Sequence, residues 1–287
     1  MGRIGIVTDA HSNPWGQDAV FDYLEREGVD RKIHLGDMVG MFPNPREVID
    51  RAREECGVIL LGNHESIMLR DFEDDSRKRQ ERIMAAYINW FQVTQEQRDF
   101  LDSLPLEYVD NGVLYVHNSP FNPKERTERY MHDRFQIANN NDKILELSNS
   151  DTCSLVFKGH SHKGSVWKIK RGLREVKEED VVETHLRRST ELSDTLVTSI
   201  DSDFVYVFEV GSACGANTMF TKDEDLDYRP SGAFFDYDSR TQTGEVTLFR
   251  TGKNYNIEAF VKSVKSDSRW EKFEEAQRQI NYLKNHL

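Results

Sequence analysis

The chain has 287 residues, enough to bury a substantial core, and we expect one large domain or a domain with an inserted piece. Asp and Glu (50) outnumber Lys and Arg (38), and the net charge of -12 disfavours a long binding track for nucleic acid or an anionic membrane. The cysteines Cys56, Cys153 and Cys214 are widely spaced, with no CxxC pair, so we expect neither a disulfide framework nor a zinc–thiolate site.

The same features bear on location. The N-terminal segment becomes strand-like at once, which leaves no room for a cleavable signal peptide. No apolar run approaches the roughly 20 residues that a membrane-spanning helix needs. The cysteine usage fits a reducing compartment. We therefore expect a soluble, cytoplasmic protein with no membrane partner.

Five short apolar runs predict buried strands, and each ends in Asp, Asn or His. Helical patterns separate the first four runs and lead into the fifth. The runs are RIGIVTD (3–9), RKIHLGD (31–37), GVILLGNH (57–64), GVLYVHNSP (112–120) and SLVFKGHSH (154–162).

The first two helices are marked by their ends. One is expected after Asp18, with Gly28 closing it. The next has Asn44 as its cap, Pro45 in the first turn, Glu47 at the capping-box position and a glycine past its end at residue 57.

Two further helical regions are expected. From 71 to 104 the pattern places Ile83, Tyr87, Trp90 and Phe91 on one face, and a second helix starts at a Thr94–Gln97 capping box. The polar stretch from 124 to 147 is also expected to be helical.

The period changes after residue 162. The runs DFVYVFEV (203–210), GAFFDYD (232–238) and EVTLFR (245–250) are strand-like, and SRTQTG between the last two predicts a hairpin. Strands alternating with helices, followed by strands alone, predict a mixed α/β layering in which a second, mainly antiparallel sheet packs on the first.

Two segments stand apart from this pattern. Residues 168–203 are rich in charge and resemble an insertion in a domain spanning 1–260. The segment 265–287 predicts an amphipathic C-terminal helix with Trp270, Phe273, Ile280 and Leu283 near helical spacing. Such a face usually docks on its own domain, and contact with a partner or a second copy is left open.

The polar residues that end the strands form one candidate site. Side chains two apart on a strand point to the same side, so His160 and His162 can reach one object, although an isolated pair is as well explained by a solvated strand end. Loops beyond the carboxyl ends of such strands converge on one crevice. The residues gathered there are Asp9, His11, Asp37, Asn63, His64, His117, His160 and His162.

So many oxygen and nitrogen donors suit two divalent ions with about four protein donors each rather than one ion. Asp37 is the natural bridge, because Gly36 and Gly40 flank it and let the backbone approach closely. Donors of this kind favour Mn²⁺, with Fe, Zn²⁺, Co²⁺ and Ni²⁺ left open.

The motifs DAHSN, GDMVG, GNHE, VHNSP and GHSH, in this order, resemble the calcineurin-like metallophosphoesterase superfamily. GDMVGMFPNP and VGSACGAN are most similar to its small bacterial and archaeal phosphodiesterase branch. The resemblance covers residues 4–164 well and 205–250 loosely. It implies a four-layer α/β/β/α sandwich with two central mixed sheets.

By motif, the resemblance implies one metal held by Asp9, His11, Asp37 and His162. It implies a second metal held by Asp37, Asn63, His117 and His160. His64 would then contact the phosphoryl oxygens or assist the leaving group, with Glu65 orienting it.

The implied reaction is hydrolysis of a small phosphodiester or phosphomonoester by in-line attack of a hydroxide that bridges two metals. Ser12 and Asn118 stand where relatives often have glycine, and the loop from 211 lacks a following arginine, which puts phosphate gripping there in doubt. The alternatives are a catalytically silent scaffold of the same fold, a protein or nucleotide phosphatase, and a nuclease acting on short ends.

Overall fold

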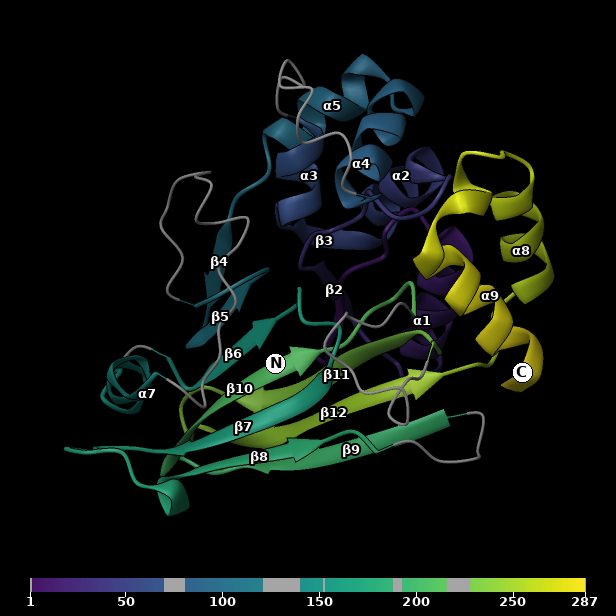
Figure 1. The fold of residues 1–287 in the computed structure, drawn as a ribbon. Coiled ribbons are helices and arrows are strands. Elements are labelled where there is room, and N and C mark those ends of the chain that lie inside the picture. The colour runs from purple at the N-terminus through teal and green to yellow at the C-terminus, as the bar shows by residue number, and fades with distance from the viewer. Residues whose placement is uncertain are drawn as a thin grey trace.

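The computed structural model describes residues 2–69, 81–120, 140–151, 153–187, 193–215 and 228–286. Two six-stranded sheets lie face to face, with helices on the outer side of each (Figure 1). The first sheet has the order β3 (Cys56–Ile59), β2 (Arg31–His34), β1 (Ile4–Val7), β11 (Ser231–Asp238), β12 (Thr243–Thr251) and β9 (Ser193–Ile200). The second has the order β4 (Glu107–Asp110), β5 (Val113–Val116), β6 (Leu155–Lys158), β10 (Phe204–Val210), β7 (Gly164–Lys170) and β8 (Val181–His185).

Both sheets are mixed. β1 pairs in parallel with β2, and β2 with β3, whereas β11, β12 and β9 run antiparallel to their neighbours. In the second sheet β6 lies in parallel between β5 and β10. The four-layer fold is confirmed, but the expectation that the late strands form a second sheet of their own is wrong: β10 joins one sheet, and β11 and β12 join the other.

The helices cover these sheets and the ends of the strands. Near the first sheet are α1 (Pro14–Arg26), α2 (Pro45–Glu55), α3 (Asn63–Met68), α4 (Glu81–Gln92), α5 (Gln95–Asp102), α8 (Ile257–Lys265) and α9 (Glu274–His286) (Figure 1). On the other side lies α7 (Asn141–Ser148). No helix in the described parts of the chain is long and apolar enough to cross a membrane.

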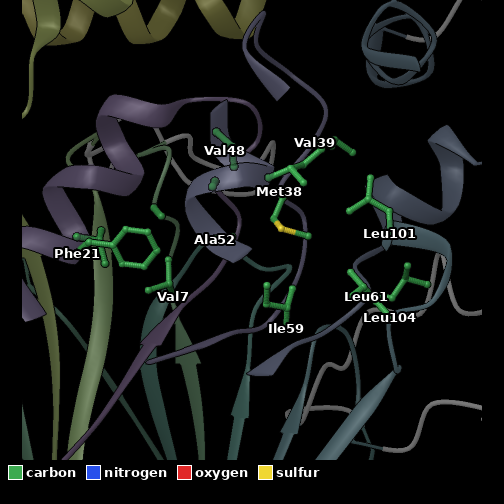
Figure 2. Packing of buried hydrophobic residues seen from close by; sticks show 14 of the residues in the cluster. Val7, Phe21, Met38, Val39, Val48, Ala52, Ile59, Leu61, Leu101 and Leu104 are labelled. Carbon is green, nitrogen blue, oxygen red and sulfur yellow. The ribbon is translucent and has the colours of Figure 1, made fainter. Parts of the chain in front are cut away.

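Apolar side chains fill the space between the layers. Between the sheets, Phe157 of β6 stacks on Phe235 of β11, with ring centroids 4.8 Å apart. On the outer side of the first sheet, Phe21 of α1 and Val48 of α2 pack over Val7 and Ile59 (Figure 2). Burial of this surface, at about 25 cal/mol per Å² of apolar area, favours the layered arrangement and holds the strand ends in place.

The predicted strands are confirmed, and the helix ends differ in detail. α1 begins at Pro14, before the expected start, because Asn13 accepts a bond of 3.1 Å from the Gly16 N–H and caps it. Asn44 precedes α2 but makes no side-chain cap bond; its amide nitrogen donates to Ser263 Oγ at 2.7 Å. The capping box expected there is therefore absent, whereas the Thr94–Gln97 box of α5 forms.

The expected apolar face of α4 is wrong. Phe91 is 61% exposed, and Tyr87 and Trp90 are half-buried. The helix instead buries its small residues and Asn89, because this narrow face lies against the loops that follow β1 and β2. Parts of two expected helices, 71–80 and 124–139, lie outside the described residues.

The charged segment 168–203 supplies edge strands to both sheets. It contains the end of β7, the 3₁₀ turn Glu178–Asp180, β8 and β9, and residues 188–192 lie outside the described part. Its assignment as an insertion stays a prediction.

The C-terminal segment packs on its own chain. Trp270, in the 3₁₀ turn Trp270–Lys272 rather than in α9, is fully buried with Ala276 and Ile280 against Phe42 and Phe260. α8, which precedes it, had no clear signal in the sequence.

Candidate metal centre

The eight polar residues predicted from the strand ends lie together. Five of them follow β1, β2 and β3, with Asn63 and His64 opening α3, and the loops after β5 and β6 of the other sheet carry three. His160 and His162 are partly exposed, whereas the other six are buried. At least 25 residues separate the donors that follow one strand from those that follow the next, so strand pairing and the packing of the two sheets bring these side chains to one place.

One group of donors contains Asp9, His11 and His162. His162 Nε2 lies 3.1 Å from Asp9 Oδ1, and His11 Nε2 lies 3.0 Å from His162 Nε2. The ligand atoms of this group all lie within 4.8 Å of one another, a spacing that can hold a metal ion.

A second group contains Asp37, His117 and His160, with Asn63 beside them. His117 Nε2 is 3.1 Å from Asp37 Oδ2. Asn63 Oδ1 lies 3.1 Å from His117 Nε2 and 2.6 Å from His160 Nδ1. These ligand atoms also meet the 4.8 Å spacing.

The two groups are adjacent. Asp37 Oδ2 is 3.8 Å from His11 Nε2 of the first group, and Asp9 Oδ1 is 4.0 Å from His117 Nε2 of the second. Asp37 also belongs to a third group with His11 and His64. Its carboxylate therefore lies where it can face two ions.

Backbone carbonyls fix the orientation of two histidine rings. His11 Nδ1 lies 3.1 Å from the Val39 carbonyl oxygen, and His117 Nδ1 lies 3.0 Å from the Leu35 carbonyl oxygen. A carbonyl only accepts, so each Nδ1 carries a proton and each Nε2 is turned toward the carboxylates and imidazoles of the cluster. Carboxylates and imidazoles gathered this closely are donors that divalent ions such as Mn²⁺ and Zn²⁺ accept, so the donor set fits divalent metal ions.

The close approach of these groups also shifts their pKa values. Burial opposes ionisation of Asp9, but His162 and His117 hold the pKa of its carboxyl well below the usual range. Burial likewise opposes protonation of His117, yet Asp37 and Asp9 raise its pKa to about 9. Positive charge is thus favoured at the centre of the cluster, as a metal site requires.

His64 differs from the other imidazoles. Burial lowers its pKa to about 3, so the ring is neutral, and its ring centroid lies 4.5 Å from that of His11. Among the described residues its Nδ1 has no hydrogen-bond partner, while its backbone N–H donates to Asp37 Oδ1 at 2.7 Å. One ring nitrogen of His64 also lies within 4.8 Å of ligand atoms of His11 and Asp37.

Glu65 holds the loop of Asp37 in place. Its Oε2 accepts from the N–H groups of Asp37 at 2.9 Å and Gly62 at 2.8 Å, and its Oε1 accepts from Met38 at 2.6 Å and Val39 at 3.1 Å. The predicted orienting role of Glu65 is therefore seen at Asp37 rather than at the His64 ring. Burial and the Asp37 charge raise the pKa of Glu65 to about 7, while the N–H donors favour its ionised form.

The backbone around the donors is strained. Five candidate ligands have left-handed backbone, which non-glycine residues adopt at a cost. They are Asp9 (φ 54), His11 (φ 45), Asp37 (φ 56), His160 (φ 66) and His162 (φ 56). The expected role of Gly40 fits this picture: its φ is 90, and a Cβ there would collide with His64 Nδ1.

The loop that begins at Gly211, where the sequence puts phosphate binding in doubt, supports Asp9. Ser212 Oγ and the Cys214 N–H donate to the Asp9 carbonyl oxygen at 2.9 and 3.0 Å. From the C-terminal helix, buried Gln279 donates to the Cys214 carbonyl oxygen at 2.5 Å. Residues 216–227, which follow this loop, lie outside the described part.

Asn89 supports two of the donor loops and had little signal in the sequence. From α4 it bonds the loops after β1 and β2, and its only sign was a polar residue inside an apolar helical stretch. His34, at the end of β2, is buried and accepts the Gly36 N–H at 3.0 Å. Phe121, His132 and the acidic run after Asp71 lie outside the described residues.

Known proteins match this chain in sequence and in fold. The family model described as the calcineurin-like phosphoesterase superfamily domain matches residues 3–177. An uncharacterised protein of Methanocaldococcus jannaschii is 28% identical over 168 residues, 55% of this chain and 62% of that protein. The match thus spans less than two thirds of the curated relative.

Solved structures extend the likeness to the whole fold. A metallophosphoesterase from Sphaerobacter thermophilus has a TM-score of 0.69 at 23% identity, with 98% of each chain covered. A protein from Pyrococcus horikoshii has a TM-score of 0.62 at 15% identity, also with 98% of each chain covered. The motif order, the two-sheet fold and the family match agree, and the chain belongs to the calcineurin-like phosphoesterase superfamily.

Proposed function

We propose that this protein is a dinuclear metal-dependent phosphoesterase that acts on small phosphodiesters, with phosphomonoesters as weaker substrates. The observation that carries the proposal is the pair of adjacent donor groups that meet at Asp37. The family membership makes phosphate-ester hydrolysis the reaction class, and the net charge of -12 favours a small ester over a long nucleic acid.

We assign the donors to two metal ions according to their positions in the site. Asp9, His11 and His162 would hold one ion, and Asn63, His117 and His160 the other, with Asp37 between them. When bound, such a pair supplies an activated water nucleophile and neutralises charge on the phosphoryl oxygens. Mn²⁺ suits these donors, and Fe, Zn²⁺, Co²⁺ and Ni²⁺ suit them as well.

His64 is the residue we assign to the substrate. Its neutral ring can donate one hydrogen bond to a phosphoryl or leaving-group oxygen, because burial keeps it from carrying a proton on both nitrogens. Gly40 leaves the space that this ring occupies. The role predicts that His64 affects turnover while contributing little to metal binding.

The test is hydrolysis of a bis(aryl) phosphate, an aryl phosphate monoester and a short oligonucleotide, with metal content measured on the same sample. We expect the diester to be cleaved fastest with added Mn²⁺ and no cleavage after chelation. His64→Asn should keep two ions and lose about 10²-fold or more in kcat, as removal of a group acting on the reacting phosphate does.

Two outcomes of this experiment would count against the proposed function. A metal-loaded protein that cleaves none of the three substrates would contradict the proposal and favour a silent scaffold. Preference for the oligonucleotide would favour the nuclease alternative. A cytoplasmic location is part of the proposal and fits the three cysteines, none of which forms a disulfide.

A further inference from the structure

The loops after β1 and β2, which carry Asp9, His11 and Asp37, are strained and adjacent. Ser12, next to His11, has φ 63, although glycine adopts this backbone far more easily than serine. Gly40, three residues after Asp37, has φ 90. Backbone of this kind persists only where surrounding bonds hold it.

Asn89 of α4 supplies such bonds to both loops. Its Oδ1 accepts from Ser12 Oγ at 2.9 Å and from the Gly40 N–H at 2.6 Å. Its amide donates to the Phe42 carbonyl oxygen at 3.1 Å and to Gln92 Oε1 at 3.0 Å. All four hydrogen-bonding positions of the side chain are thus filled, and Asn89 is fully buried.

The hydrogen bonds of Asn89 reach the two loops at residues close to the candidate ligands. Ser12 follows His11 directly, and the Ser12 N–H also donates to the Met38 carbonyl oxygen at 2.7 Å. Gly40 touches the ring of His64, so a shift of Gly40 moves the surface against which that ring rests. Asn89 therefore acts at the two places where the loops approach each other.

We propose that Asn89 is a positioning residue that joins the loop of Asp9 and His11 to the loop of Asp37 and so fixes the spacing between the two donor groups. The consequence for turnover rests on the proposed phosphoesterase function. The consequence for metal binding does not, and it can be measured without substrate.

If Asn89 only filled space in the core, an apolar residue of similar volume could replace it. The neighbours on the buried face of α4 are Ala85, Ala86 and Ile88, so an apolar side chain of similar volume would fill the space. Asn89→Leu would do so but leave the Ser12 hydroxyl and the Gly40 N–H without their acceptor. An effect on metal binding beyond any loss of stability therefore identifies the positioning role.

The experiment compares Mn²⁺ binding by calorimetry and thermal unfolding of the metal-free protein for wild type, Asn89→Leu and Val246→Ala. Val246 is buried on β12 in the core between the sheets, so its variant controls for lost stability alone. We expect Asn89→Leu to weaken at least one Mn²⁺ binding step by about tenfold, as loss of a residue that orients metal ligands does. Val246→Ala should lower the melting temperature while its Mn²⁺ affinity stays within about twofold of wild type.

Ser12 gives a second, milder set of variants. Ser12→Ala removes the hydroxyl and keeps the strained backbone, whereas Ser12→Gly removes the hydroxyl and relieves it. We expect both to weaken Mn²⁺ binding, with Ser12→Gly the more stable of the two. Adding Ser12→Ala to Asn89→Leu should cost no further affinity, because the bond is already lost.

In kinetics, Asn89→Leu should lower kcat with little change in KM, since it touches no substrate. Wild-type Mn²⁺ affinity in Asn89→Leu, or a loss no greater than in Val246→Ala, would overturn the proposal. Should Asn89→Leu fail to fold, unchanged affinity in both Ser12 variants would overturn it equally. A wild type that binds two ions but cleaves no ester would refute the proposed function and leave the affinity comparison intact.

Discussion

Replacing Glu65 with Gln tests how the Asp37 loop is held. The carboxylate accepts four backbone N–H groups, two on each oxygen. The amide of Gln puts an NH₂ group in place of one oxygen, so two of the four bonds are lost and two buried donors face another donor. Hydrogen bonds to a charged group contribute about 1.5–3 kcal/mol each, which gives a loss of about 3–6 kcal/mol.

The assay is urea unfolding of the metal-free protein at pH 8, where the Glu65 carboxyl is ionised. Glu54→Gln is the matched control, because Glu54 is 70% exposed on α2 and should change the free energy of unfolding by no more than about 0.5 kcal/mol. Weaker Mn²⁺ binding should accompany the loss in Glu65→Gln, since Asp37 then lacks its support. A loss below about 1 kcal/mol in Glu65→Gln would refute the reasoning.

Other variants test other parts of the fold. Lys158→Met should cost about 3–5 kcal/mol because it leaves Glu209, 2.8 Å away, as an unpaired buried charge, and Lys158→Met with Glu209→Met should recover most of the loss. Burial opposes ionisation of Glu209, but Lys158 lowers its pKa. The pair therefore stabilises above the unfolded pKa of about 4.3, and wild-type stability should fall as the pH drops through the folded value. Thr94→Ala should lower the free energy of unfolding by about 1 kcal/mol, because it removes the cap of α5. Chelation should lower the melting temperature, because each ion held at 100 times its Kd adds about 2.7 kcal/mol.

The donors could be predicted from sequence because each follows an apolar run. Strands 4 residues long that are followed closely by Asp or His, such as β1 and β6, are local signals. The parallel packing of their neighbours then places the ends together. The motif order added the division into two donor groups.

The supporting residues could not be predicted in the same way. Asn89 lies 77 residues from Ser12, and only the packing of α4 brings them together. The aromatic residues of α4 suggested a different buried face, which concealed Asn89. The assignment of late strands failed for a related reason, since the pairing of strands far apart in the chain depends on tertiary contacts that no local pattern records.

The most direct test of the central claim is anomalous diffraction from crystals of the Mn²⁺-loaded protein, with elemental analysis of the same preparation. The account predicts two ions per chain, with Asp37 bound to both and His64 bound to neither. A single ion, ions held by other residues, or the donors left without metal at saturating Mn²⁺ would contradict it.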